Sequence, residues 1–470
     1  MRRAAELLRR HRAVWRLVAG SAAAGLAVAT GAIALAGPWD AGQRTAERDA
    51  AADAERYGSD AERVGVTVPA ADPVLAPLDA AARESSPAAL ERELVPLLEN
   101  PALGDHVTAA VVDVTTGASL YAKGARSGRA PASTVKLITA VTALHALGPD
   151  HRLTTTAVLD AEEDRVILVG GGDVTLTDDD LRALAERTAE ALADRGAGTV
   201  RVGYDVSRYA REEDHPIGVN TNIAPITPLQ INEGRLDDST KGPAPRSTDP
   251  AADAAEAFAR HLADAGVDVK GGAAARRTAP EGAERLARHR SAPLSSLVER
   301  MLTNSDNDLA EAIARATAVA TGNDADFDGV RRAVTGQLEE LGLPLGGVRV
   351  ADASGLDRHG RITARLLTQA LATAADPARP ELRAIFTGLP IAGFSGTLAG
   401  RFDESDGAGA GLVRAKTGTL TGVNTLAGTA MTPDGRVLAF AFMANETTNA
   451  GEAEAALDAA ATALATCVCH

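Results

Sequence analysis

Ser133 and Lys136 are the first pair of residues whose types and spacing suggest catalysis. They stand three positions apart near the start of residues 132–147, an apolar stretch that the sequence predicts to be one helix. Residues at i and i+3 share a helix face, so the amine can lie within reach of the hydroxyl and make the serine nucleophilic. Only five of the 48 basic residues are lysines. This indicates that position 136 needs a property that Arg lacks, the loss of its proton near neutral pH.

An S-x-x-K tetrapeptide alone is weak evidence, because Ser and Lys are common on helix surfaces. Two further motifs follow it in the chain, Ser305-Asp306-Asn307 and then Lys416-Thr417-Gly418-Thr419. A K-T-G tripeptide would rarely occur by chance in a chain with five lysines. The three motifs in this order are therefore much stronger evidence for a catalytic site than any one of them.

The chemistry that these residue types fit is acyl transfer. Ser133 would attack a carbonyl carbon, and Lys136 would take its proton, with a pKa lowered by burial and by a cationic neighbour. Ser305 would pass the proton to the leaving amine, and the Asn307 amide would hold the substrate peptide. The backbone N–H groups of Ser133 and Thr419 are the expected oxyanion donors.

The Lys416 motif is expected to bind the leaving group. Lys416 would stand at the end of a short edge strand and supply positive charge, while the hydroxyls of Thr417 and Thr419 bind a substrate carboxylate. Gly418, which has no side chain, would let the substrate backbone approach closely.

The three motifs together resemble those of the penicillin-binding protein and serine β-lactamase superfamily, and within it the D-alanyl-D-alanine carboxypeptidase/endopeptidase family typified by penicillin-binding protein 4. The resemblance covers roughly residues 88–470 and extends to secondary motifs at 171–176, 352–356 and 389–398. It implies a serine D-Ala-D-Ala carboxypeptidase that acts on peptidoglycan stem peptides through an acyl-enzyme on Ser133. It also implies β-lactam binding, D,D-endopeptidase cleavage as a further reaction, and no cofactor or metal.

An antiparallel sheet with helices packed on it must position these motifs. Strands are predicted at 107–114, 118–123, 412–415, 424–431 and 437–443, with helices before, between and after them. The predicted fold class is therefore α+β, a serine transpeptidase/β-lactamase-like domain built from 88–150 and 290–470. Residues 151–289 are predicted to form an inserted smaller α/β domain. Family members typically nest a third domain after the segment that here ends at Asn232, but only the loop 233–250 occupies that place, so we expect this domain to be missing.

The N-terminus predicts export from the cytoplasm. Six arginines lie within residues 1–16, and residues 17–36 are 20 uncharged, mostly apolar residues, long enough to cross a bilayer. Residues 1–36 are therefore expected to be a membrane anchor or a signal peptide, and 37–87 a stalk. For residues 43–63, a peripheral helix packed on the domain is an equal alternative. The expected location is extracytoplasmic, in a bacterial cell envelope. A net charge of −15 argues against nucleic acid as a partner.

The only cysteines, Cys467 and Cys469, are expected to be an incidental tail. In an extended chain, a bridge between positions i and i+2 would be strained, and two thiols with His470 are too few ligands for a closed metal site.

Two other functions compete with the carboxypeptidase. A serine β-lactamase would need a deacylating carboxylate, typically E-x-x-x-N between the second and third motifs, and none occurs between Asn307 and Lys416. A non-catalytic, membrane-tethered wall-binding protein could keep the fold, but the intact Ser133, Lys136, Ser305 and Lys416 argue against such a loss of activity.

Overall fold

A computed structural model describes residues 86–211, 213–271, 274–402 and 407–467. The predicted membrane segment (1–36) and nearly all of the predicted stalk (37–87) lie outside these residues. Within the described part of the chain, no helix is long and apolar enough to cross a membrane.

The larger sheet has five strands in the order β2-β1-β11-β10-β9, and every neighbouring pair is antiparallel. Its strands are β1 (His106–Asp113), β2 (Ser119–Lys123), β9 (Val413–Leu420), β10 (Val423–Met431) and β11 (Val437–Asn445). β1 pairs with β11 from the far end of the chain, with Ala109 opposite Phe442 and Val111 opposite Phe440. Strands that are far apart in sequence therefore complete the sheet, and β9 forms one of its edges.

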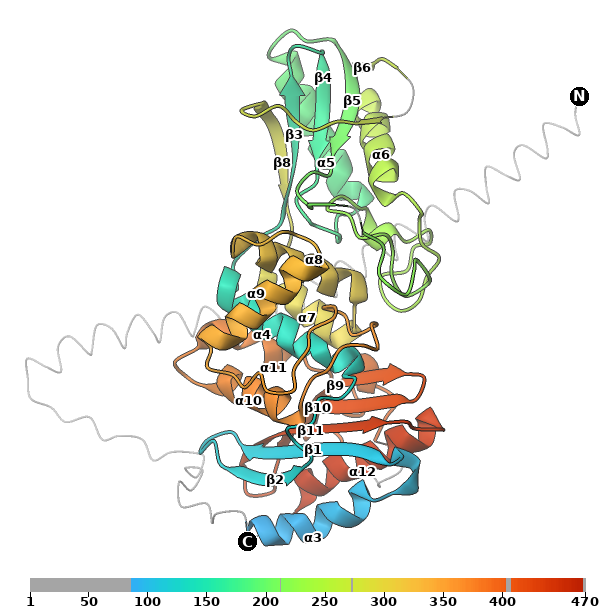
Figure 1. The fold of residues 1–470 in the computed structure, drawn as a ribbon. Coiled ribbons are helices and arrows are strands. Elements are labelled where there is room, and N and C mark those ends of the chain that lie inside the picture. Colours follow the sequence, from blue (N-terminus) through green and yellow to red (C-terminus); the bar gives the residue numbers. More distant parts are fainter. Residues whose placement is uncertain (1–85, 212, 272–273, 403–406, 468–470) are drawn as a thin grey trace, which may run out of the picture. The chain divides into compact units, whose positions relative to one another are not determined.

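Helices cover both faces of this sheet (Figure 1). One face packs on α3 (Pro87–Leu98) and α12 (Ala450–Thr466). The other packs on a helical layer that contains α4 (Lys136–Leu147), α7 (Leu294–Asn304), α8 (Asn307–Ala320), α9 (Phe327–Glu340), α10 (Ala364–Ala375) and α11 (Ala384–Gly388). Side chains of β11 alternate between these two cores, since Phe440 and Phe442 belong to one and Ala441 and Met443 to the other. The predicted α+β fold is confirmed.

A second, mixed sheet lies between α4 and α7 in the chain. It contains β3 (Thr154–Asp160), β4 (Arg165–Val169), β5 (Thr199–Asp205), β6 (Asp268–Val269), β7 (Ala275–Arg276) and β8 (Glu284–Arg290). Helices α5 (Asp178–Ala193) and α6 (Pro250–Asp264) contribute to its core. Residues 235–249 contain no helix or strand, only the isolated bridge between Arg235 and Arg246.

Three local expectations need correction. The strand expected at 412–415 continues to Leu420, so Lys416 lies inside β9 and not at its end. The helix expected over 132–147 opens with a 3₁₀ turn, Ala132–Val135, and becomes an α-helix only at Lys136. Cys467 is disulfide-bonded, in contrast to the incidental tail that extended-chain geometry suggested.

Candidate active site

The Ser133 hydroxyl lies on the 3₁₀ turn that precedes α4. The turn begins at Ala132, whose φ of 44° is in the left-handed region that side chains other than glycine rarely adopt. Lys136 follows at the first α-helical position, and its Nζ lies 3.0 Å from Ser133 Oγ. The spacing that the sequence suggested therefore does bring the two side chains together, although through a 3₁₀ turn and not an α-helical one.

Lys136 is fully buried and has three polar partners. Besides Ser133 Oγ, its Nζ donates to Asn307 Oδ1 at 2.7 Å and to the Ser354 carbonyl at 2.6 Å. Asn307 Nδ2 donates to the Asn222 carbonyl at 3.0 Å, which fixes the amide with its oxygen toward the lysine. A neutral amine has two hydrogens and one lone pair. When the two carbonyl oxygens accept both hydrogens, the lone pair is left to accept the proton of Ser133 Oγ.

Burial lowers the pKa of Lys136 to about 8, against the opposing effect of four carboxylates, those of Asp352, Asp306, Glu311 and Asp308. The four carboxylates favour the protonated form, whereas Lys416 is the cationic neighbour that was expected, since its charge and that of Lys136 repel each other. A substantial fraction of Lys136 is nevertheless neutral at about pH 7 to 8, as a general base requires.

Ser305 stands at the junction of α7 and α8. It ends α7 with φ 59° and ψ 41°, a left-handed residue, and Asp306 then begins α8 by accepting a hydrogen bond from the Leu309 amide at 3.0 Å. This sharp change of direction places Ser305, Asp306 and Asn307 on the wall of the same pocket as Ser133. The left-handed conformation of Ser305 explains why the motif lies between two helices and not within one.

The K-T-G-T motif runs along edge strand β9, which contacts the 3₁₀ turn of Ser133. Lys416 is fully buried and its Nζ donates to the Thr417 carbonyl at 2.8 Å. Burial, then the charges of Lys136 and Arg401, lower the pKa of Lys416 well below its usual range. The charge of Lys416 therefore depends on its surroundings, and an anionic ligand nearby would favour its protonated form.

Gly418 is required for close packing inside the protein. A Cβ atom there would lie 2.2 Å from Thr425 Oγ1, 2.9 Å from the Pro131 carbonyl oxygen and 3.0 Å from the Ser133 backbone nitrogen. The glycine thus lets β9 approach the turn that carries Ser133, a reason different from the expected approach of a substrate backbone.

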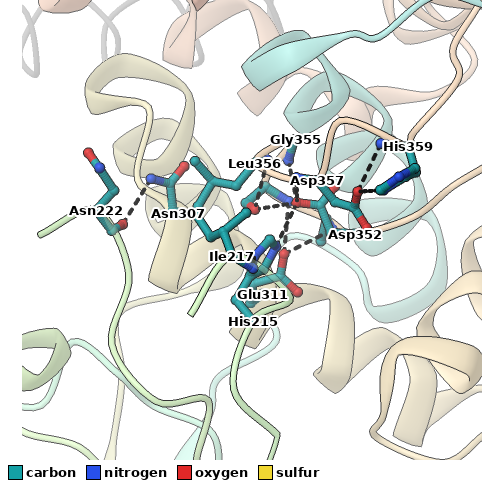
Figure 2. A network of polar contacts seen from close by, with 12 residues as sticks. His215, Ile217, Asn222, Asn307, Glu311, Asp352, Gly355, Leu356, Asp357 and His359 are labelled. Carbon is teal, nitrogen blue, oxygen red and sulfur yellow. Dashed lines mark hydrogen bonds and ion pairs between the residues drawn. The ribbon is translucent and has the colours of Figure 1, made fainter. Parts of the chain in front are cut away.

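A buried network that the sequence did not predict supports the Lys136 contacts (Figure 2). His215 Nε2 lies 3.0 Å from Asp352 Oδ2, and both side chains are almost completely buried. Asp352 Oδ2 also accepts from Ser354 Oγ at 2.7 Å and from the Gly355 amide at 2.9 Å. The network thereby holds the turn whose Ser354 carbonyl contacts Lys136.

Glu311 supports the same turn from α8, since its Oε1 accepts from the Ala353 and Ser354 amides, both at 3.0 Å. His215 and Asn222 belong to the segment after β5, far from the three motifs in sequence. No local periodicity marks either residue, so sequence reasoning missed both. Asp352 was part of a secondary motif but had no assigned role.

Ser133 opens into a pocket of about 340 Å³. Its wall includes Ser305, Asn307, Thr417 and Thr419. It also includes residues outside the three main motifs: Asn222, Arg235, Lys241, Arg246, Thr397, Arg401 and Glu454. Three of these, Arg235, Lys241 and Arg246, come from the loop at 233–250, which contains no strand or α-helix up to residue 249. Thr417 Oγ1 is bonded to Thr397 Oγ1 at 2.7 Å, and Thr419 Oγ1 to Glu454 Oε1 at 2.7 Å.

A model of the D-Ala-D-Ala carboxypeptidase 3 (S13) family matches residues 90–245 and 237–465. A carboxypeptidase DacB of Mycolicibacterium smegmatis is 37% identical over 416 residues, which cover 85% of this chain and 88% of that protein. A D-alanyl-D-alanine carboxypeptidase of an Actinomadura species is 30% identical over 447 residues, covering 76% and 81%.

The fold is also similar to that of a solved structure. Penicillin-binding protein 4 (dacB) of Haemophilus influenzae matches with a TM-score of 0.64 and 22% identity, over 81% of this chain and 98% of that one. That protein has also been solved in complex with a β-lactam.

Proposed function

The chain belongs to the D-Ala-D-Ala carboxypeptidase 3 (S13) family of serine peptidases, and we propose that Ser133 is its nucleophile and Lys136 its general base. The reaction is the hydrolysis of the terminal D-Ala-D-Ala bond of peptidoglycan stem peptides, which matches the names of the relatives. The observation that carries the residue assignment is the fully buried Lys136 Nζ, 3.0 Å from Ser133 Oγ.

In the first half of the reaction, neutral Lys136 accepts the proton of Ser133 Oγ while that oxygen attacks the carbonyl carbon of the penultimate D-Ala. The backbone N–H groups of Ser133 and Thr419 stabilise the oxyanion. Collapse of the tetrahedral intermediate breaks the C–N bond, and Ser305 relays a proton to the leaving amine. The products are an ester on Ser133 and free D-alanine.

In the second half, water attacks the ester carbonyl. Lys136, neutral again, accepts a proton from the water, and the serine oxygen leaves and regains a proton. Asn307 holds Lys136 Nζ through its Oδ1, so we assign it a role in orienting the base in addition to the substrate contact expected from its motif. Lys416, Thr417 and Thr419 bind the leaving residue.

A β-lactam presents a strained amide to the same serine, so we propose that β-lactams acylate Ser133. Because no E-x-x-x-N supplies a deacylating carboxylate, the ester should persist. The expected result is one covalent adduct per chain after incubation with penicillin, measured as intact mass and mapped to the peptide that contains Ser133. Ser133→Ala is the control and should remain unmodified.

Two outcomes would favour the competing functions. Rapid loss of the adduct with turnover of penicillin would indicate a β-lactamase. An unmodified wild-type protein that also leaves D-Ala-D-Ala peptides intact would indicate a non-catalytic wall-binding protein. A label on a peptide without Ser133 would contradict the assignment of the nucleophile.

The pKa of about 8 for Lys136 predicts how acylation depends on pH. The neutral amine is the active form, so roughly a tenth of the enzyme is active at about pH 7 and nearly all above about pH 9. The rate constant for acylation by a fluorescent penicillin should therefore rise about tenfold from about pH 7 to a plateau above about pH 9. Circular dichroism at each pH would verify that the protein stays folded. A flat profile across this range would contradict the general-base role.

The family acts on the cell wall, so the folded part of the chain is extracytoplasmic. We further propose that residues 1–36 export the protein and tether it to the membrane, because the arginine-rich start and the following uncharged segment have the pattern of an anchor.

A further inference from the structure

Six arginines gather where three segments that are far apart in the sequence lie side by side. Backbone hydrogen bonds join the segments: Arg349 and Arg361 exchange two, at 2.7 and 2.8 Å, and Arg129 exchanges two with Ile362, both at 2.9 Å. We call the six the arginine patch; they come from residues 125–129, 347–349 and 357–365 and are Arg126, Arg129, Arg349, Arg358, Arg361 and Arg365.

The charge of this patch is opposite to that of the whole chain. The protein has 63 acidic and 48 basic residues, yet the three segments contain six arginines and a single acidic residue, Asp357. Two carboxylates beside the patch contact histidines: Asp357 Oδ1 lies 2.8 Å from His359 Nδ1, and Glu446 Oε2 lies 3.3 Å from His106 Nε2. Among the residues that the structure describes, no acidic group forms an ion pair with any of the six arginines. The patch therefore has positive charge that the protein itself does not neutralise by direct contact.

The surface is hollowed at two places within the patch. Arg126 and Arg365 line a hollow of about 520 Å³ beside β2 and α10. Arg129, Arg358 and Arg361 line a second hollow of about 300 Å³ beside the turn between β9 and β10. A guanidinium group presents a planar set of N–H donors that matches the oxygens of a phosphate or a carboxylate. The hollows can thus receive separate anionic groups of one extended ligand.

The patch begins close to the catalytic pocket. Leu356 lines that pocket, and Arg358, two residues later, donates to the Thr421 carbonyl at 2.7 Å. Thr421 follows directly on β9, the strand whose Thr419 is also part of the pocket wall. A polymer that places one stem peptide at Ser133 can therefore extend over the patch.

We propose that the arginine patch binds an anionic wall polymer, one that carries phosphate or carboxylate groups, and so holds the enzyme on the material that it cleaves. The proposal concerns a surface outside the catalytic pocket and does not depend on the roles given to Ser133 and Lys136.

An anionic lipid bilayer is the other partner that such a charge could attract, and the surface fits it less well. Proteins that lie on a bilayer insert large apolar side chains into the interface. None of the exposed large apolar residues in the described part of the chain belongs to the patch; they are Ile217, Leu236, Phe394, Met431 and Val437. Hollows also suit the single groups of a polymer better than a flat surface.

The test measures binding of the full-length protein, in a non-ionic detergent, to fluorescently labelled polyphosphate and polyglutamate. These two probes distinguish phosphate from carboxylate as the preferred group. The patch variant is Arg126→Gln/Arg349→Gln/Arg365→Gln, chosen because these side chains form no hydrogen bond within the described part of the chain. Arg126→Glu serves as a second, single replacement, and thermal unfolding verifies that each variant is folded.

The matched control is Arg92→Gln/Arg260→Gln/Arg277→Gln. It removes the same charge from three exposed arginines that are scattered over α3, α6 and the residue after β7. None of the six substituted arginines lines the catalytic pocket, so both triple variants should be acylated by penicillin at the wild-type rate.

We expect the wild type to bind at least one of the two polymers, with an affinity that falls as salt is added. The patch variant should bind about tenfold more weakly or worse at about 50 mM salt, while the control keeps the wild-type affinity within about twofold. The polymer that binds more tightly would identify the anionic group.

Three results would overturn the proposal. The first is a wild type that binds neither polymer, and the second is an equal loss of affinity in both triple variants, which would mean that only net charge matters. The third is displacement of the polymer by detergent micelles containing phosphatidylglycerol as effectively as by unlabelled polymer, which would identify a membrane as the partner.

Discussion

Lys136→Arg should abolish acylation of Ser133 by β-lactams, while Lys416→Arg should retain a measurable rate. A guanidinium stays protonated at any usable pH and cannot accept the serine proton. Both lysines are fully buried, so both variants share the cost of fitting a larger side chain, and the difference between them reports proton chemistry. We expect a gap of at least about tenfold, equivalent to roughly 1.4 kcal/mol of activation free energy.

The measurement is a titration of both variants with a fluorescent penicillin, after thermal unfolding has verified that each is folded. Lys416 lies near Lys136, so the two sites also share their electrostatic surroundings in part. If Lys136→Arg acylates as fast as Lys416→Arg, the base is another group and Lys136 serves only to orient Ser133.

Gly418→Ala is the second change with a large expected effect. The added methyl group would lie 2.2 Å from Thr425 Oγ1 and 3.0 Å from the Ser133 nitrogen, so either β9 or the turn that carries the nucleophile must move. Displacements of about 1 Å in an active site can cost about 100-fold in rate. We therefore expect acylation to slow by at least about 100-fold, with the chain still folded.

Gly336→Ala provides the control for this experiment. Gly336 lies within α9, and a Cβ there would meet no atom within 4 Å beyond the backbone of its own helix and its chain neighbours. This variant should acylate at the wild-type rate and be slightly more stable, because alanine favours a helix. If Gly418→Ala is acylated at the wild-type rate, β9 can shift without affecting the reaction. The close approach of β9 to the turn that carries Ser133 would then not be needed for acylation.

The sequence was sufficient to predict the fold class and to identify several of the residues that lie together at the pocket. Short motifs carry this information because each is a local unit: Ser133 and Lys136 share one turn, and Ser305 and Asn307 flank one helix junction. Continuous, mostly apolar runs likewise located most of β10 and β11, because both faces of each strand are buried, each against a separate core.

The parts that the sequence did not predict depend on contacts between distant segments. His215 bonds Asp352, which lies 137 positions later in the chain. Asn307 bonds the carbonyl of Asn222, which lies 85 positions earlier. Such contacts follow from the path of irregular loops, which have no periodicity to read. The short strands β6 and β7 were missed for a related reason, since two-residue strands are defined by their neighbours and not by their composition.

The origin of those distant contacts bears on how this enzyme can be re-engineered or recombined. Three contacts join the segment between α4 and α7 to the rest of the site. His215 bonds Asp352, and the Asn222 carbonyl accepts a hydrogen bond from Asn307. Arg246 forms an ion pair with Asp308 at 3.0 Å. The segment is therefore not a detachable module. Exchanging it for the equivalent piece of a relative would require the partner residues on α8 and in the turn after Val350 to be exchanged with it, so the two parts are expected to be inherited together.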